Sequence, residues 1–509
     1  MAAHIPRRQR GQMSATTETD RRRQWALAAL LILATAFAAR VSEFGNPFSD
    51  VDENFYLLVG DRMWHGALPY VDIWDRKPIG LFLIYAAIRL LGGAGFYQYQ
   101  IVAALFAAGT GFIVARIAAP MAGIVAATWA GMLYVLLIGL VSGGWGGQAP
   151  IFYNLPVAGA ALMVQQLVLR KETDPSRVRR AGCAAMLLLG LAMQIKYTVI
   201  FEGIFFGLVL LWRSWRTSGA TGRPIVDALL WMAIALLPTA LALGFYALHG
   251  EAGAFLYANF LSIGQRASEP GAELLYRLGK AGQISGIPLC VVALSAWLKP
   301  WRRFEDGPAA FGFVMAWLGA ALAGYFAFGT WFDHYALPVF VPMAAACAPA
   351  FALRRRHAGA IIALILLLAA GTADMLILRN NRNKHGDAAL AAAMVAAIRP
   401  RLTNCMFVWG GDAILYHLTG SCIPSRFAFP SHLFLKREAG AIGVDPIAEI
   451  RRILATRPSV IVDETPRDAE DVPAALAVVA AEIARSYRQV AAFPMKKSTI
   501  VVYERVDRR

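Results

Sequence analysis

Residues 181–212 read AGCAAMLLLGLAMQIKYTVIFEGIFFGLVLLW, an apolar stretch with a basic cluster at each end. Arg180 closes the cluster before the stretch, and Arg213 opens the cluster after it. Cytoplasmic loops of membrane proteins carry an excess of Lys and Arg. A single long helix would place one of these clusters outside the cytoplasm. The stretch is therefore predicted to be a hairpin of two short spans that turns near Lys196 and Tyr197.

The same rule predicts the membrane topology of the rest of the chain. Apolar runs of roughly 17–25 residues, the length that crosses a bilayer core, recur along the sequence. About eleven spans are predicted, starting near Trp25, Tyr97, Met121, Pro150, Ala181, Thr198, Val226, Gly282, Ala309, Tyr335 and Ala358. With the N-terminus inside, basic loops at 116, 170–180, 213–223, 299–303 and 354–356 are all cytoplasmic.

One apolar run, residues 78–92, must stay on the outer face for this threading to hold. It is short and has Arg89 near its end, so it is predicted to lie at or dip into the membrane surface. The alternative is that it does span the membrane and the middle of the chain inverts. That inversion would place the 170–180 basic cluster outside.

Composition agrees with a polytopic α-helical membrane protein. Hydrophobic residues make up 58% and charged residues only 16% of the 509 residues, whereas soluble domains carry about 25% charged residues. The net charge of +16 lies in clusters between apolar runs, which indicates membrane topology and not a nucleic-acid partner. The run from Trp25 is too long for a signal peptide and lacks a clear cleavage site, so it is predicted to remain as the first span.

The expected organisation has three parts. Residues 1–24 form a basic cytoplasmic tail, 25–379 a transmembrane catalytic domain, and 380–509 a small extracytoplasmic α/β domain. The threading also leaves residues 45–96, 142–149 and 250–281 outside. The C-terminal part is expected to contain helices at 387–398, 412–418, 446–455 and 472–485 and strands at 405–409, 459–462, 489–493 and 499–503. A disulfide between Cys405 and Cys422 is expected, because an extracytoplasmic domain folds in an oxidising compartment.

The first outer stretch, 45–96, is dense in groups that perform chemistry. Asp50, Asp52 and Glu53 cluster just after a span, where low-dielectric surroundings raise carboxylate pKa values, and such a trio is also a potential divalent-metal site. The stretch ends in the cationic Arg76-Lys77, followed by a proline. An ordinary solvated loop is the alternative interpretation.

Other polar residues are predicted to converge on the same face. Lys196 lies at the tip of the hairpin, and ionisable groups at membrane depth are costly and usually functional; a snorkelling lysine is the alternative. His334 and Tyr335 open the tenth span, and Gln148 lies in a glycine-rich outer loop. Cationic side chains can hold the phosphate of a lipid-linked donor, and a carboxylate beside them can act as the base for an acceptor hydroxyl.

Several short motifs of the chain resemble those of a known superfamily. They are Asp52-Glu53-x-x-Tyr56, Gly66-x-x-x-Tyr70-x-Asp72, Asp75-Arg76-Lys77-Pro78, His334-Tyr335-x-x-Pro338, Trp409-Gly410 and Ser425-Arg426-Phe427. They resemble the GT-C glycosyltransferases, most closely the bacterial group that includes protein mannosyltransferases and the aminoarabinose and galacturonic acid transferases of lipid A. The resemblance covers nearly the whole chain, and its most specific part is the first outer loop.

The resemblance implies roles for individual residues. Asp52 would be the catalytic base or the acid that orients it, with Glu53 beside it as the second catalytic residue. Lys77 would contact the donor phosphate, with Arg76, Lys196 and His334 as further phosphate-binding candidates. The remaining candidates are Asp50, Tyr56, Asp72, Asp75, Gln148 and Tyr335. The chain departs from the family at Ile79, where a second proline is common. It also has Gln148 and Asn154 in the second outer loop, where many members carry an acid. The missing acid puts metal binding in doubt, because a metal site would have fewer anionic oxygen ligands.

The expected function is transfer of a sugar from a polyprenyl-phosphate donor to an extracytoplasmic acceptor, with inversion at the anomeric carbon. The expected partners are that donor, the acceptor (lipid A, another glycan, a lipid or a protein) and the bilayer of a bacterial inner (plasma) membrane. No cofactor is expected with certainty, and a divalent metal stays open. Two alternatives are a transporter of lipid-linked glycans and a polysaccharide polymerase or ligase. The absence of internal repeats argues against the transporter.

Overall fold

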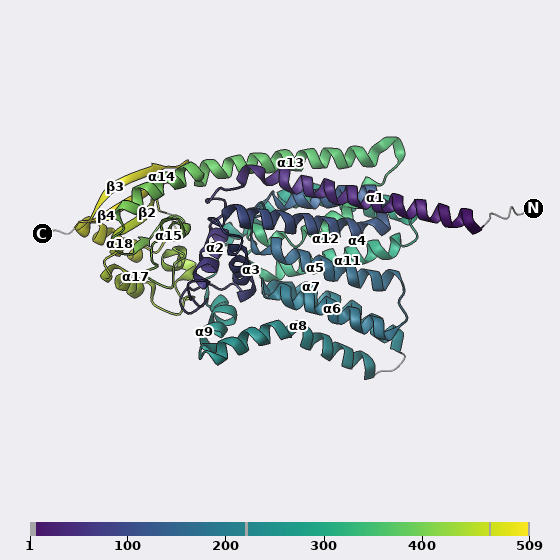
Figure 1. Cartoon of the computed structure of the whole chain (residues 1–509), viewed down its shortest axis with the longest axis horizontal. Coiled ribbons are helices and arrows are strands. Elements are labelled where there is room, and N and C mark those ends of the chain that lie inside the picture. The colour runs from purple at the N-terminus through teal and green to yellow at the C-terminus, as the bar shows by residue number, and fades with distance from the viewer. Residues whose placement is uncertain (1–6, 219–221, 468–469, 507–509) are drawn as a thin grey trace, which may run out of the picture.

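The computed structural model describes residues 7–218, 222–467 and 470–506. Most helices run side by side along the long axis of the molecule, and the small sheet lies at one end (Figure 1). The first helix begins at the end of the bundle opposite the sheet and runs along the bundle toward the sheet domain (Figure 1).

Ten helices build the bundle. They are α1 (Arg7–Arg40), α4 (Phe96–Ile138), α5 (Ala149–Leu169), α6 (Pro175–Met193), α7 (Ile200–Ser218), α8 (Gly222–Leu248), α10 (Gly271–Leu298), α11 (Gly307–Phe328), α12 (Phe340–Phe351) and α13 (Ala358–His385). Within the described ranges, eight helical segments are long and apolar enough to cross a membrane. The chain is therefore a polytopic helical membrane protein.

Helix α4 consists of two spans joined at Gly123. Gly123 has φ 77° and ψ 165°, a conformation that breaks a right-handed helix and suits glycine. Gly111 and Gly131 then face each other so closely that a β-carbon on Gly131 would lie 2.4 Å from the Gly111 carbonyl oxygen. The two halves therefore run back along one another. With α4 counted as two spans, the eight segments make nine spans. Helices α6, with 19 residues, and α12, with 12 residues, lie in the bundle but are not among those eight segments, so the eleven spans predicted from the sequence stay a prediction.

The hairpin at 181–212 forms as predicted. Helix α6 ends at Met193, Lys196 is extended at φ −159° and ψ 127°, and α7 resumes at Ile200 after one short turn. The 78–92 run forms only α3 (Ile79–Arg89). At about 1.5 Å per residue, α3 is roughly half as long as a bilayer core is thick. It lies with α2 (Val51–Met63) between the bundle and the sheet (Figure 1).

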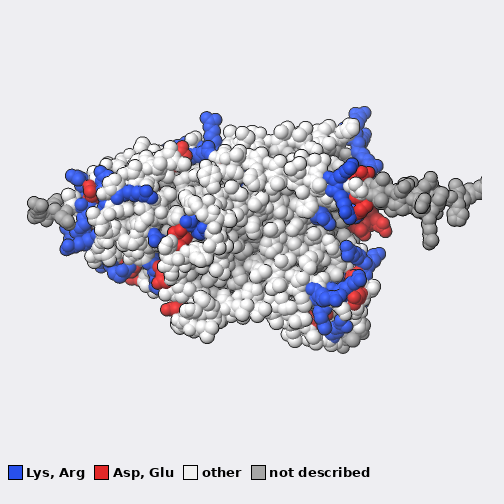
Figure 2. All heavy atoms as spheres, viewed as in Figure 1, with Lys and Arg blue, Asp and Glu red and all other residues white. Residues whose placement is uncertain are grey.

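The distribution of charge defines a membrane belt. Figure 2 shows Lys, Arg, Asp and Glu gathered toward the two ends of this face, with a broad band between them that lacks such residues. Large apolar side chains are exposed along α8 and α10, among them Leu241 at 65% and Ile287 at 64%. An apolar band exposed on the surface of a helical bundle is the surface that lipid tails cover.

We expect the N-terminus and the C-terminal domain to lie on opposite sides of the membrane, with the N-terminus cytoplasmic. The reason is that the five basic loops share one side in the threading. Reporter fusions at Asp174 and beyond Arg509 should therefore report opposite compartments. A C-terminal fusion that reports the cytoplasm would contradict this topology.

The C-terminal part folds around a four-stranded sheet. Its helices are α14 (Ala388–Ile398), α15 (Ile414–Thr419), α16 (Ser431–Phe434), α17 (Pro446–Ala455) and α18 (Pro473–Ser486), and its strands are β1 (Met406–Val408), β2 (Val460–Thr465), β3 (Tyr487–Pro494) and β4 (Thr499–Arg505). The strand order is β1-β2-β4-β3; β1 and β2 are parallel, and the other pairs are antiparallel. All the elements expected from the sequence are present within a few residues. The sequence did not indicate α16, because four residues carry no helical periodicity.

The sheet domain is tied to the outer loops by polar contacts and ring packing. Arg62 of α2 donates to the Ser421 carbonyl at 2.6 Å, and Asp61 accepts from His417 at 3.2 Å. The Trp74 ring lies 4.8 Å from the His432 ring. These contacts hold the domain against the first outer loop, where the candidate site residues lie.

Cys405 and Cys422 form a disulfide with Cα atoms 4.9 Å apart. Cys405 directly precedes β1, and Cys422 follows α15, so the bridge closes a loop of 17 residues in sequence separation. We expect both thiols to be protected from alkylation until a reductant is added, and mass spectrometry of the alkylated peptides measures this. The control is the same sample denatured and reduced before alkylation, in which both cysteines should be labelled. Full labelling of Cys405 and Cys422 without reductant would rule the bond out.

Candidate active site

A cavity of about 830 Å³ lies where the bundle meets the sheet domain. Nine of the sequence-derived candidates line it: Asp50, Asp52, Asp75, Arg76, Lys77, Gln148, Lys196, His334 and Tyr335. They come from five separate stretches of the chain. The cavity is thus the place where the outer loops, the hairpin tip and the sheet domain converge.

The first turn of α2 carries the two carboxylates of the cavity wall. Asp50 is the N-cap residue, and its Oδ1 accepts from the Asp52 backbone N–H at 3.0 Å. Aspartate is favoured at this position because it satisfies the free N–H groups of a helix start. Ser142 donates to the other Asp50 oxygen at 3.3 Å. Burial, and next the charge of Asp52, raise the pKa of Asp50 to about 7.

Asp52 is held in one orientation by Gln148. The Gln148 amide nitrogen donates to Asp52 Oδ2 at 2.9 Å, while its oxygen accepts from the Tyr56 hydroxyl at 3.2 Å and from the Ala149 N–H at 3.0 Å. Burial acts to raise the pKa of Asp52, but attraction to Lys77 and the Gln148 hydrogen bond contribute to a net lowering. Asp52 is therefore an ionised carboxylate facing the cavity.

Lys77 lies opposite this carboxylate, one residue before the proline that caps α3. Its ammonium is 5.3 Å from the centre of the Tyr56 ring. Burial acts to lower the pKa of Lys77, but the carboxylates of Asp52 and Asp75 outweigh burial and raise it. Lys77 is thus charged, and within the described residues no carboxylate pairs with it within 4 Å.

Lys196 and His334 complete the polar wall on the bundle side. The Lys196 ammonium lies 3.8 Å from the centre of the Tyr335 ring. His334 packs edge-on against Tyr335, with ring centres 4.7 Å apart. Burial, and next the charge of Lys77, lower the pKa of Lys196 well below its ordinary value. An anion bound beside Lys77 and Lys196 would offset the charge of Lys77 and favour the charged form of Lys196.

Three candidates take other positions. Glu53 is fully buried and faces the glycine loop, so close to Gly146 that a β-carbon there would lie 1.9 Å from Glu53 Oε2. Burial and the charge of Asp50 raise the pKa of Glu53 well above its ordinary value, so Glu53 is a neutral group outside the cavity. Asp72 is exposed and caps the Leu68 N–H at 2.7 Å. Tyr56 is buried behind the cavity wall, where its ring lies against the Lys77 ammonium and its hydroxyl donates to Gln148.

The acidic trio does not converge. The Asp50 and Asp52 carboxyl groups face the cavity, whereas Glu53 turns away from it. Among the described residues, no group of three or more His, Cys, Asp or Glu side chains is placed to hold a metal ion. Adjacent residues on a helix point about 100° apart, which separates Glu53 from Asp52.

Arg76 joins the two parts of the protein. It pairs with Glu438 of the sheet domain at 2.5 Å and donates to the Ala441 carbonyl at 3.2 Å. Glu438 also accepts from Arg266 at 2.6 Å. Burial alone would raise the pKa of Glu438, but the cations around it, Arg76 foremost, lower it to about 2.

The far wall of the cavity contains residues that are not among the sequence-derived candidates. They are Arg266, Arg277 and Lys280 from the third outer stretch and Ser431, His432, Arg437 and Glu438 from the sheet domain. Arg277 pairs with Glu273 at 2.7 Å, and Lys280 pairs with Asp333. A signal was present, because three cations in the predicted outer stretch 250–281 run against the positive-inside rule. The sheet-domain residues gave no such signal.

Comparison with known proteins supports the architecture. No family model matches the chain, and no curated protein matches it by sequence. The structure is similar to ArnT from Cupriavidus metallidurans in the apo state, with a TM-score of 0.60 and 13% identity over 96% of this chain and 98% of that one. It is also similar to the same ArnT bound to undecaprenyl phosphate, with a TM-score of 0.61 and 13% identity over 94% and 97% of the two chains.

The likeness extends over the bundle and the sheet domain together, because nearly all of each chain is covered. The resemblance of the first outer loop and the three-dimensional likeness therefore lead to the same architecture. The chain therefore shares its fold with ArnT from Cupriavidus metallidurans.

Proposed function

We propose that the protein is a glycosyltransferase that moves a sugar from a polyprenyl-phosphate carrier to an acceptor outside the cytoplasm. One observation carries the proposal: an ionised carboxylate, Asp52, faces a cavity that also presents Lys77 and Lys196, two lysines without carboxylate partners among the described residues. The solved ArnT complex with undecaprenyl phosphate, which shares the fold, supports the class of carrier.

The donor phosphate lies between the two lysines in this proposal. Charge-assisted contacts to phosphate are roughly twice as strong as neutral hydrogen bonds. An anion at this position also removes the repulsion between the lysines and favours the charged form of Lys196. His334 and Tyr335 border the same space and orient the phosphate oxygens.

The reaction is a displacement at the anomeric carbon. The acceptor hydroxyl oxygen forms a bond to that carbon while the bond to the phosphate oxygen breaks. Asp52 takes the hydroxyl proton, and the polyprenyl phosphate leaves with the bonding electrons, its charge stabilised by Lys77 and Lys196. In this proposal the hydroxyl attacks from the side opposite the phosphate, so the anomeric configuration inverts.

In vitro release of sugar from a polyprenyl-monophosphate donor tests this function. We expect the purified protein to consume the glycosylated lipid and produce free polyprenyl phosphate when an acceptor is present. A transporter would move the lipid across a vesicle membrane without consuming it, and a polymerase or ligase would act only on a diphosphate-linked glycan. Mass spectrometry of lipids from a deletion strain should show the accumulated donor and thereby name its sugar.

A further inference from the structure

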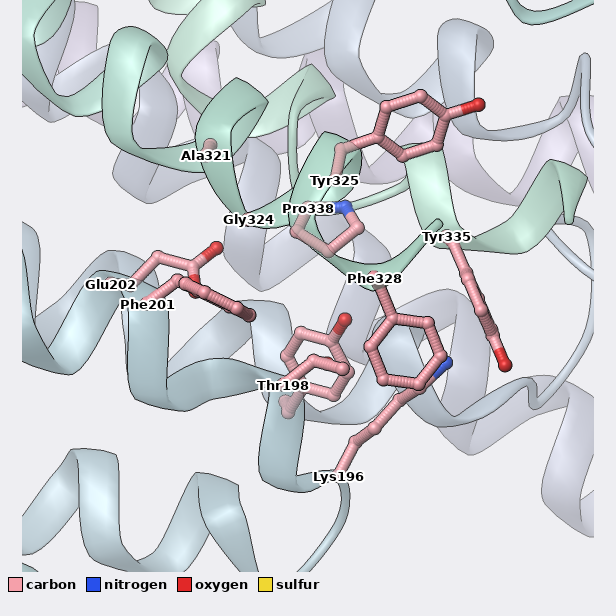
Figure 3. A pocket seen from close by; sticks show the side chains of 11 residues that line it. Lys196, Thr198, Phe201, Glu202, Ala321, Gly324, Tyr325, Phe328, Tyr335 and Pro338 are labelled. Carbon is pink, nitrogen blue, oxygen red and sulfur yellow. The ribbon is translucent and has the colours of Figure 1, made fainter. Parts of the chain in front are cut away.

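A second, much smaller cavity adjoins the phosphate-binding lysines, deeper in the bundle. Its volume is about 30 Å³, and it lies between α7 and α11 (Figure 3). Five residues line both cavities: Lys196, Thr198, Phe201, Phe328 and Tyr335. The small cavity therefore begins where the donor phosphate is proposed to lie.

The acid of this small cavity is Glu202. Glu202 lies in the first turn of α7, is 4% exposed, and its carboxyl group faces the space between α7 and α11 (Figure 3). Its side chain forms no hydrogen bond or ion pair with any other described residue. The one donor recorded for this carboxyl group within the described residues is its own backbone N–H, and a carboxyl group can accept further hydrogen bonds. An occupant that donates a hydrogen bond to this carboxyl group would use that remaining capacity.

The size of the cavity limits the occupant. A cavity needs at least roughly 10–15 Å³ on this measure to hold one water, so about 30 Å³ suits one small polar group and excludes a sugar ring. The carboxyl of Glu202 accepts hydrogen bonds, and the hydroxyl groups of Tyr153 and Thr198 add polar character to the lining. A hydroxyl or amino substituent matches both the size and the hydrogen-bonding character.

We propose that this cavity receives one hydrogen-bond-donating substituent of the donor sugar and that Glu202 is a residue that determines donor specificity. The inference rests on the proposed function, because the sugar reaches the cavity only when its phosphate lies at Lys77 and Lys196. The carrier phosphate itself has no contact with Glu202 in this arrangement. Glu202 therefore acts on the affinity for the sugar and not on the affinity for the carrier.

Binding measured with and without the sugar tests the inference. The probes are undecaprenyl phosphate alone and undecaprenyl phosphate carrying a hexose, a 6-deoxyhexose or an amino sugar. For the sugar that wild type prefers, Glu202→Leu should raise the Kd roughly tenfold or more, as expected for loss of a hydrogen bond to a charged group. Glu202→Gln should show a smaller change, and the Kd for undecaprenyl phosphate alone should not change.

Asp374→Leu is the matched control. Asp374 is likewise a buried carboxyl group, in α13, but it lines neither cavity. This variant should bind every probe as wild type does. Unchanged binding in Glu202→Leu would show that the cavity holds water only and would overturn the inference, as would an equal loss of the bare carrier and the glycosylated carrier. A wild-type protein that binds neither lipid would instead contradict the proposed function.

Discussion

Asp52→Asn should abolish sugar transfer while leaving donor binding intact. Asparagine keeps the size and the hydrogen bond from Gln148 but cannot accept the proton of the acceptor hydroxyl. General-base catalysis by a positioned group contributes roughly 10²–10⁴-fold, so turnover should fall by that factor. The measurement is the rate of polyprenyl-phosphate release with saturating donor and acceptor, together with the Kd of the donor.

The two neighbouring acids, Asp50 and Glu53, provide control variants for Asp52→Asn. Asp50→Asn should be milder, because asparagine caps a helix about as well as aspartate and Asp50 faces Ser142 and the α2 backbone. Glu53→Gln should change little, because its high pKa already makes Glu53 neutral. If either variant loses activity while Asp52→Asn keeps near-normal turnover, the base is assigned to the wrong carboxylate. Full activity in all three variants would refute the catalytic role of this loop.

Lys77→Ala should weaken donor binding much more than it lowers the stability of the folded protein. A charge-assisted contact to phosphate contributes roughly 1.5–3 kcal/mol, so the donor Kd should rise about tenfold or more. Lys77→Arg should retain part of the affinity, because the charge is kept but its geometry differs. The Kd of undecaprenyl phosphate and the thermal midpoint of unfolding are measured on the same samples.

Lys280 provides the matched comparison for Lys77. It lines the same cavity and is a lysine, but its ammonium already pairs with Asp333. Lys280→Ala should therefore raise the donor Kd by less than Lys77→Ala does. Equal effects would mean that the cavity attracts the lipid through its overall charge, and unchanged donor binding in Lys77→Ala would remove Lys77 from the site.

The sequence by itself determined the membrane architecture. Apolar runs of bilayer length and basic loops report local properties of the chain, namely hydrophobicity and charge, and neither depends on which helices are neighbours. The same local signals predicted the hairpin at Lys196, the surface position of α3 and the strands and helices of the sheet domain. The motif around Asp52 and Lys77 likewise lies in one short stretch.

Only the tertiary structure decided which of these residues meet. It turned Glu53 away from the cavity, because adjacent helix residues point about 100° apart, and it paired Arg76 with Glu438, 362 residues later in the chain. It also placed Glu202 in a cavity beside Lys196, although the sequence shows only an acid within an apolar run. Contacts between distant segments depend on packing in three dimensions, which the pattern of a single stretch does not encode.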